Sequence, residues 1–311
     1  MYMNKDIAKS KEIEKWIGSR CHYTEENELS DFYVQMNRDC GNNHSRVIWE
    51  WLRNAPCFEE FNIDKIKMWK ENGQVVCAVR SMSPWLGEAV IDNRCSTKET
   101  LYEIIQYVEE NLSMKEENQK HIFMVVLDQG DDFDQLLRKE GYEKLSLGTG
   151  TLQYNLQKEI PQVTLENGFR ILPLSEVFDF DQLSKLIWFG FHYEGDIPKI
   201  NDDVKLSIKH AWLNYNRDIC SVILDENGDY ASFCGFWYDE TTQTAYLEPM
   251  VTLEKYRNMG LGKAVVLNSL KILQKYGCMK AFVDPDEETY NYYIKIGFEP
   301  FEYARFYQKT F

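Results

Sequence analysis

A glycine-containing segment with two basic residues is the part of this sequence whose residue types indicate chemistry. It stands between a predicted strand at 244–251 and a predicted helix at 261–276, and it reads Arg257-Asn258-Met259-Gly260-Leu261-Gly262-Lys263. The first N–H groups of a helix have no partner within the helix and lie at the positive end of its dipole, so they attract an anion. The glycines allow the close approach of a phosphate or serve only a tight turn, and this segment alone leaves both open.

Two familiar phosphate loops do not fit this segment. The dinucleotide fingerprint GxGxxG lacks its last glycine here, and the Walker pattern GxxxxGK[ST] is absent. If the segment binds a phosphate, it does so as a third type of loop.

The second half of the chain predicts an α+β domain around this loop. Apolar periodicity predicts helices at 179–190, 205–215, 261–276 and 287–296, and strands at 169–174, 221–225, 230–238, 244–251, 280–283 and 301–308. Gly277 and Gly297 follow the last two helices, where a glycine commonly ends a helix.

The chain contains an internal repeat. Residues 127–142 align without a gap with residues 283–298, and Glu71-Asn72-Gly73 aligns with Glu226-Asn227-Gly228 at nearly the same spacing. Asn-Gly before a strand-like run is a hairpin signal. The two matches predict tandem domains at 1–156 and 168–311, joined by a polar stretch, each with a mixed, mostly antiparallel twisted sheet flanked by helices.

The second copy resembles the GNAT superfamily of N-acetyltransferases. That family carries [Q/R]-x-x-G-x-[G/A] at the start of the helix after its fourth strand, and Arg257 to Gly262 fits this pattern. It also carries a Tyr four residues before a Gly-Phe pair, which Tyr293 and Gly297-Phe298 supply. The resemblance covers residues 168–311 and implies transfer of an acetyl group from acetyl-CoA, as cosubstrate, to an amine by direct attack.

The resemblance also implies roles for single residues. The segment Arg257–Lys263 would hold the pyrophosphate of acetyl-CoA, chiefly through the backbone amides from Met259 onward. Met250 and Val251 would pair with the pantetheine arm, and the Val251 N–H would face the developing oxyanion. Asp286 stands where family members often carry Asn, so that cofactor contact stays open.

The residues predict an acid and a base, each with a plainer alternative. Tyr293 would protonate the departing thiolate as general acid, or it is simply a packed aromatic. Glu248 would deprotonate the amine, because strand alternation places it with Tyr246 and Met250 among apolar neighbours, which raise the pKa of a carboxyl. Its alternative role is that of a structural carboxylate bound to nearby amides.

An aromatic and acidic segment after the helix at 179–190 is the candidate acceptor pocket. Aromatic faces and a carboxylate could hold a cationic amine, and the candidate residues are Trp188, Phe191, Tyr193 and Glu194. The alternative is a core stripe followed by a solvated acidic loop.

The composition limits the classes of binding partner that we expect. The chain of 311 residues carries 50 acidic and 35 basic residues, a net charge of −15. This charge disfavours nucleic acid and favours a small cationic amine. No apolar run is long enough to span a bilayer, and the charged start resembles no signal peptide, so we expect a cytoplasmic protein without a membrane partner. The eight cysteines form no CxxC pair, so we expect no metal site.

The predicted function is therefore N-acetylation of a primary amine, and the alternative is a non-catalytic acyl-CoA sensor. Transfer of a longer acyl group, or transfer to a nucleophile other than an amine, stays open. The first copy lacks RxxGxG and has Leu137 where the second has Tyr293. We interpret it as a degenerate domain that packs on the catalytic copy and closes one side of the acceptor pocket, or that binds an effector or forms a homodimer.

Overall fold

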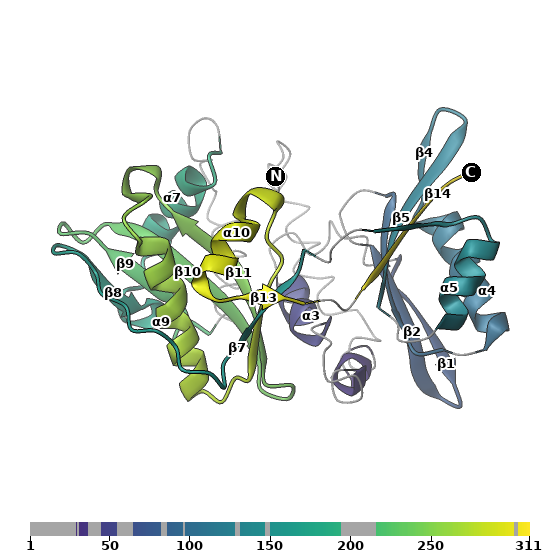
Figure 1. Cartoon of the computed structure of the whole chain (residues 1–311), viewed down its shortest axis with the longest axis horizontal. Coiled ribbons are helices and arrows are strands. Elements are labelled where there is room, and N and C mark those ends of the chain that lie inside the picture. Colours follow the sequence, from purple (N-terminus) through teal and green to yellow (C-terminus); the bar gives the residue numbers. More distant parts are fainter. Residues whose placement is uncertain are drawn as a thin grey trace, which may run out of the picture.

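The computed structural model describes Leu29 and residues 31–36, 45–54, 65–81, 86–95, 97–127, 131–146, 150–193, 216–301 and 304–311. Two sheets of seven strands each form the framework of this part of the chain. They stand side by side with helix α3 (Ser45–Asn54) between them (Figure 1).

The first sheet has the strand order β1-β2-β3-β5-β14-β6, and β4 pairs with the outer part of β5. Helices α4 (Lys98–Asn111) and α5 (Asp131–Lys139) cover one of its faces (Figure 1). The strand bounds are β1 Lys67–Glu71, β2 Gln74–Ser81, β3 Glu88–Asn93, β4 Met114–Glu116, β5 Gln119–Leu127, β6 Glu143–Leu145 and β14 Arg305–Thr310.

The second sheet has the order β13-β7-β12-β11-β10-β9-β8. Its strands are β7 Leu152–Asn155, β8 Arg170–Pro173, β9 Ser221–Leu224, β10 Tyr230–Asp239, β11 Thr244–Thr252, β12 Lys280–Val283 and β13 Glu299–Pro300. The helical elements of this half are α6 Leu174–Val177, α7 Phe180–Gly190, the 3-10 turn η3 Glu254–Tyr256, α9 Leu261–Lys275 and α10 Glu287–Ile296.

The two halves of the chain exchange one strand each. The C-terminal strand β14 lies in the first sheet, antiparallel to β5 on one side and to β6 on the other. In return, β7 lies in the second sheet between β12 and β13 (Figure 1). The predicted domain boundary, between residues 156 and 168, divides the chain into two consecutive segments. Each sheet nevertheless contains one strand from the segment on the other side of this boundary.

Most predicted elements have their expected bounds. The helix predicted at 287–296 and the strand at 280–283 are α10 and β12. The Asn-Gly hairpin between β1 and β2 is confirmed, since Asn72 and Gly73 have φ of 51° and 79°. The predicted strand 301–308 is wrong in bounds and place: β13 ends at Pro300 and β14 starts at Arg305, in the other sheet. The helix predicted at 205–215 lies outside the described residues.

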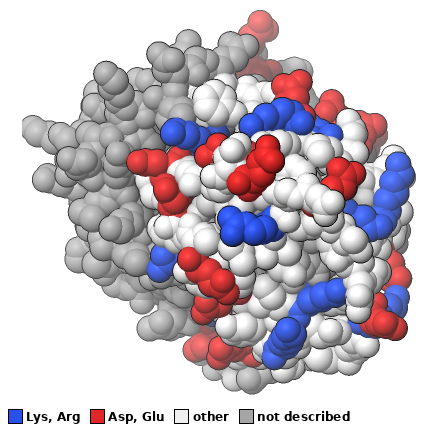
Figure 2. Space-filling model, turned by 90° about the vertical axis from the view of Figure 1, so that its left-hand side faces the viewer, with Lys and Arg blue, Asp and Glu red and all other residues white. Residues whose placement is uncertain are grey.

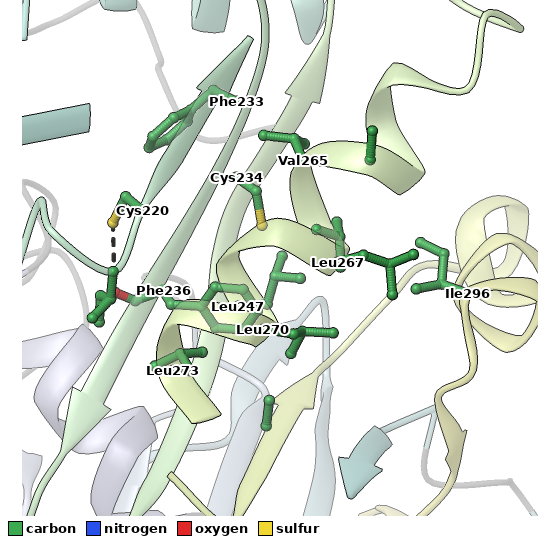
Figure 3. Packing of buried hydrophobic residues seen from close by; sticks show 14 of the residues in the cluster. Cys220, Phe233, Cys234, Phe236, Leu247, Val265, Leu267, Leu270, Leu273 and Ile296 are labelled. Carbon is green, nitrogen blue, oxygen red and sulfur yellow. Dashed lines mark hydrogen bonds between the residues drawn. The ribbon is translucent and has the colours of Figure 1, made fainter. Parts of the chain in front are cut away.

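Two apolar cores hold the second half in place. The first is formed by β9, β10 and β11 against α9 and α10, and Figure 3 shows Leu247 and Phe236 beside the α9 residues Leu267, Leu270 and Leu273. The second lies between the two sheets and joins Tyr33 and Trp49 to residues of both halves, namely Ala78, Tyr246, Phe282 and Phe301. The face of β11 opposite α9 therefore meets the N-terminal half of the chain.

Candidate active site

The N-terminus of α9 lies open at the end of β11. Gly260 is the N-cap, with φ of 76° and no side-chain hydrogen bond to the first helical amides. A Cβ added to Gly260 would meet nothing within 4 Å, so this glycine serves the left-handed backbone rather than packing. Asn258 is also left-handed, with φ of 64°. The first turn holds no acidic residue, and Lys263 is exposed beside it. This turn fits an anion.

Gly262 is needed for a different reason. A Cβ built there would lie 2.4 Å from Tyr292 Oη, 2.6 Å from Met250 Cε and 3.2 Å from Thr252 Oγ1. The missing side chain lets α9 start directly against β11 and α10. Among the residues that the structure describes, the buried Tyr292 hydroxyl has no hydrogen-bond partner. Sequence reasoning passed over Tyr292 as one of several aromatics on a crowded helix.

β11 separates from β12 where it approaches this turn. The parallel pairing of the two strands ends at Tyr246 and Phe282, although β11 continues to Thr252. On the other side, the register with β10 shifts between Cys234 and Phe236, opposite the cis peptide bond Glu248–Pro249. Such a bulge bends a strand away from its neighbour. The described part of β12 therefore leaves one edge of β11 unpaired beside α9.

The register decides which main-chain groups face that gap. The Leu253 N–H donates to the Ala231 carbonyl at 3.1 Å, and the Ser232 hydroxyl donates to the Val251 carbonyl at 3.1 Å. Alternate residues of a strand direct their main-chain groups to the same side, so Val251 faces β10. Met250 and Thr252 face the gap instead. The Val251 N–H therefore does not face the gap, which contradicts its predicted oxyanion role.

Glu248 is half-buried at the bulge and lies next to a second carboxylate. Burial, and after it the charge of Asp284, raises the pKa of Glu248 to about 7. Asp284 follows β12 and accepts hydrogen bonds from the hydroxyls of Thr151 and Tyr246, the latter at 3.2 Å. Sequence reasoning missed Asp284 as a site residue, although the repeat aligns it with Asp128.

Tyr293 lies on the inner side of α10, with 7% of its surface exposed. Its ring makes edge contacts with Tyr292 and Phe298, at centroid distances of 5.2 and 5.5 Å. Burial, followed by the charges of Cys234, Tyr292 and Glu248, raises the pKa of Tyr293 well above its usual 10. A phenol in this setting keeps its proton at neutral pH.

Asp286 is the N-cap of α10. Its carboxylate accepts the Thr289 N–H at 2.8 Å and the Thr289 hydroxyl at 2.5 Å. These hydrogen bonds lower the pKa of Asp286. Its cofactor contact stays a prediction.

Arg257 connects the loop to the end of α7. Its guanidinium donates to the Gly190 carbonyl at 2.7 Å and to the Thr252 carbonyl at 3.2 Å, and it lies 2.7 Å from His192 Nε2. Gly190 also packs tightly, because a Cβ there would lie 2.0 Å from Val251 Cγ2. These bonds show a structural role for Arg257. Its predicted contact with the phosphate stays a prediction.

Three of the four predicted acceptor residues gather at the end of α7. The Tyr193 ring lies 5.0 Å from the Trp188 ring and 6.3 Å from the Phe191 ring, centroid to centroid. Phe191 is 42% exposed, so it is not a core residue. The fourth, Glu194, lies outside the described residues.

Among its described residues, the first half has no unpaired strand edge beside the start of a helix. β3 and β5 pair in parallel from Glu88 and Phe123 to Asp92 and Leu127, where β5 ends. At the start of α4, the Glu71 carboxylate accepts a hydrogen bond from the Thr97 hydroxyl at 3.2 Å and from the Cys95 thiol at 3.1 Å. An internal carboxylate thus stands beside this helix N-terminus.

Charge at the outer end of the second half is mixed. Figure 2 shows acidic and basic side chains interspersed on that face, without a single patch of one sign. Within the described ranges, no group of three or more His, Cys, Asp or Glu side chains could hold a metal ion. No described helix is both long and apolar enough to cross a membrane.

Comparison with known proteins agrees with this geometry. Residues 180–298 match the Acetyltransferase (GNAT) family. The glucosamine 6-phosphate N-acetyltransferase of Trypanosoma brucei brucei is 35% identical over 57 residues, which are 18% of this chain and 39% of that enzyme. The chain therefore spans well under two thirds of that relative.

Two solved structures share the fold at 11% sequence identity. A GCN5-related N-acetyltransferase from Sphaerobacter thermophilus superposes with a TM-score of 0.54, over 77% of this chain and 78% of that one. A tandem GNAT protein from the clavulanic acid biosynthesis pathway also gives 0.54, over 94% of this chain and 96% of that one. The second likeness extends over both sheets.

Proposed function

Since the chain contains a domain of the acetyltransferase (GNAT) family, we propose that it is an N-acetyltransferase that uses acetyl-CoA and a small primary amine, preferably cationic. The observation that carries this proposal is the unpaired edge of β11 beside the uncapped start of α9. An extended pantetheine arm can add to such an edge as a further strand, with the pyrophosphate at the helix N-terminus. The unpartnered Tyr292 hydroxyl beside Gly262 also fits a polar cofactor there.

Each residue then has a definite task. When bound, acetyl-CoA supplies an activated acetyl thioester. Glu248 accepts the proton of the ammonium form, because a carboxyl with a pKa of about 7 is a stronger base than an ordinary glutamate. The main-chain N–H of Met250 or Thr252 would face the thioester carbonyl. Tyr293 would donate its proton to the departing sulfur, the second proton that the nitrogen loses as the amide forms would return to Tyr293, and the proton held by Glu248 would pass to solvent.

The first half would not bind acetyl-CoA in this manner. In the described residues of this half, β3 and β5 stay paired to Asp92 and Leu127 and leave no edge there for the pantetheine arm, and the Glu71 carboxylate would repel a pyrophosphate at the start of α4. We therefore assign one cofactor site to each chain. An acyl-CoA sensor is the second candidate, and it would need neither Glu248 nor Tyr293.

The cofactor site is tested by a matched pair of glycine substitutions. Gly260→Glu and Gly73→Glu place the same side chain at left-handed positions with φ of 76° and 79°, both open to solvent. Only Gly260→Glu brings a negative charge to the start of α9, where it stabilises the helix but repels phosphate. In a thermal-shift titration we expect acetyl-CoA and desulfo-CoA to stabilise wild type and Gly73→Glu, and not Gly260→Glu. Equal stabilisation of both variants would refute the site.

Turnover separates the enzyme from the sensor. Thiol release from acetyl-CoA with a panel of primary amines should occur in wild type. Tyr293→Phe should keep the thermal shift and lose turnover. If no amine supports turnover while acetyl-CoA still stabilises the protein, the sensor is the better description.

A further inference from the structure

The exchanged strand brings a residue of the N-terminal half to Asp284, the carboxylate beside Glu248. Thr151 stands directly before β7 and is 2% exposed. Its hydroxyl donates to one oxygen of Asp284, while the Tyr246 hydroxyl donates to the other oxygen at 3.2 Å. Asp284 is thus fixed from two strands, one of which belongs to the other half of the chain.

Strand geometry places Asp284 beside Glu248. Tyr246 and Phe282 are the last paired residues of β11 and β12, and Glu248 and Asp284 each follow two residues later. Side chains two residues apart on a strand share a face. The bond between Tyr246 and Asp284 confirms that this carboxylate lies on the Tyr246 face. The two carboxylates therefore flank the point where the strands separate.

We propose that Asp284 is a positioning residue for Glu248, and that Thr151, supplied by the N-terminal half, holds it there. This inference rests on the proposed function, in which Glu248 is the base. A fixed negative charge beside Glu248 makes the loss of its proton less favourable, so Glu248 is a better base near neutral pH. The N-terminal half is then a part of the catalytic centre rather than only a neighbour of it.

Among the described charged groups around Glu248, Asp284 is the one that can raise its pKa. Of the described groups, Asp284, directly after β12, raises the pKa of Glu248, and the charge of Glu248 in turn raises the pKa of Tyr293 on α10. The other charged groups of the packed elements are engaged or exposed. Arg46 of α3 pairs with Asp239 of β10 at 3.2 Å, and Lys185 of α7 and Lys263 of α9 are exposed.

A pH profile tests the role of Asp284. With the amine that gives the fastest thiol release, kcat/KM of the full chain is measured across pH for wild type, Asp284→Asn and Asp229→Asn. Asp229 is an exposed carboxylate in the β9–β10 turn and serves as the matched charge control. We expect Asp284→Asn to move the acid limb to lower pH by about half a unit or more, with kcat reduced more than KM is raised. An acid limb that stays in place would overturn the proposal.

The role of Thr151 is tested by conservative rescue. Thr151→Val keeps the shape and removes the hydroxyl, whereas Thr151→Ser keeps the hydroxyl. We expect kcat/KM to fall about tenfold in the valine variant and to recover in the serine variant. If both variants match wild type, or both lose activity equally, Thr151 does not act through Asp284.

One measurement separates this inference from the proposed function. Unfolding by urea at pH 5 and pH 8 reports the titration of Glu248 without any substrate. We expect the loss of stability between these pH values to shrink in Asp284→Asn, as it does in Glu248→Gln. If that holds while no amine is acetylated, the carboxylate pair stands and the proposed reaction fails. If Asp284→Asn shows the wild-type pH dependence, the inference fails whatever the activity.

Discussion

Replacing Tyr307 tests the exchange of strands directly. Tyr307 belongs to β14 at the end of the chain, yet its fully buried side chain reaches α5 of the first half. Its hydroxyl donates to Asp134 at 2.5 Å. Burial acts against the ionised carboxylate, but hydrogen bonds from Tyr307, Lys144 and Arg138 prevail and lower the pKa of Asp134 to about 2.

The magnitude follows from this geometry. Tyr307→Phe removes the hydrogen bond to the half-buried, charged Asp134 carboxylate and should lower the free energy of unfolding by about 2 kcal/mol. Tyr307→Ala also empties a core position and should cost about 3–5 kcal/mol. Because the Asp134 pKa is depressed, its contribution is present above its ordinary value of 3.8 and is lost as pH falls toward 2. The Tyr307→Phe penalty should shrink over the same pH range.

Hydrogen exchange gives the location of the effect. We expect the amides of β5, β6 and α5 to lose protection in Tyr307→Ala, while those of α9 keep it. Gln308→Ala is the control on the same strand, because Gln308 is exposed and its loss should change stability by less than about 0.5 kcal/mol. Protection lost around β13 and α10 instead would show that the C-terminal strand pairs within its own half, and would refute the exchange.

Three further predictions concern the second half. Glu248→Gln should remove one contribution to the pH dependence of stability. Because the folded pKa of about 7 exceeds the ordinary 4.5, Glu248 should make the wild type lose about 2 kcal/mol of unfolding free energy between pH 5 and 8, after allowance for solvent screening of a half-buried group, and in urea unfolding the glutamine variant should lose less by this amount. Gly190→Ala should lower stability by about 1–3 kcal/mol through its clash with Val251, and a second change, Val251→Ala, should restore most of it in thermal unfolding. Calorimetric titration should find one acetyl-CoA per chain, and a stoichiometry of two would contradict the closed first half.

Local elements were predictable because their causes are local. The apolar run of β12, the apolar spacing of α9 and the glycine after α10 all lie within a few neighbouring residues. The partner of a strand is not a local property, so the pattern at 305–310 predicts a strand but not the sheet that contains it. The exchange depends on the path of the chain between the two sheets.

The same limit applies to the site. The motif correctly located the helix start. Strand alternation was expected to place Glu248 with both Tyr246 and Met250, but the extra residue in β11 puts these two on opposite faces: Tyr246 pairs with Trp237, whereas Met250 pairs with Cys234 and faces α9 at Gly262. The prediction that the Val251 N–H faces the gap was wrong, because the register of β11 on β10 after the bulge at Glu248–Pro249 turns this group toward β10. The Arg257 bonds to Gly190 and the fixing of Asp284 by Thr151 join residues far apart in sequence, so neither has a signature in spacing.

The bulge also explains how one fold gives an open half and a closed one. In the first half, β2 and β3 pair without a shift from Cys77 and Asn93 to Ser81 and Ala89, and β3 stays bound to β5 to its end. In the second half, one extra residue in β11 shifts its register on β10, and the strand then leaves β12. This bulge lies beside the edge of β11 that β12 leaves unpaired, on which a ligand can add as a further strand. The bulge and the glycine-containing turn before α9 therefore distinguish the second half from the described part of the first, where Glu71 stands beside the start of α4.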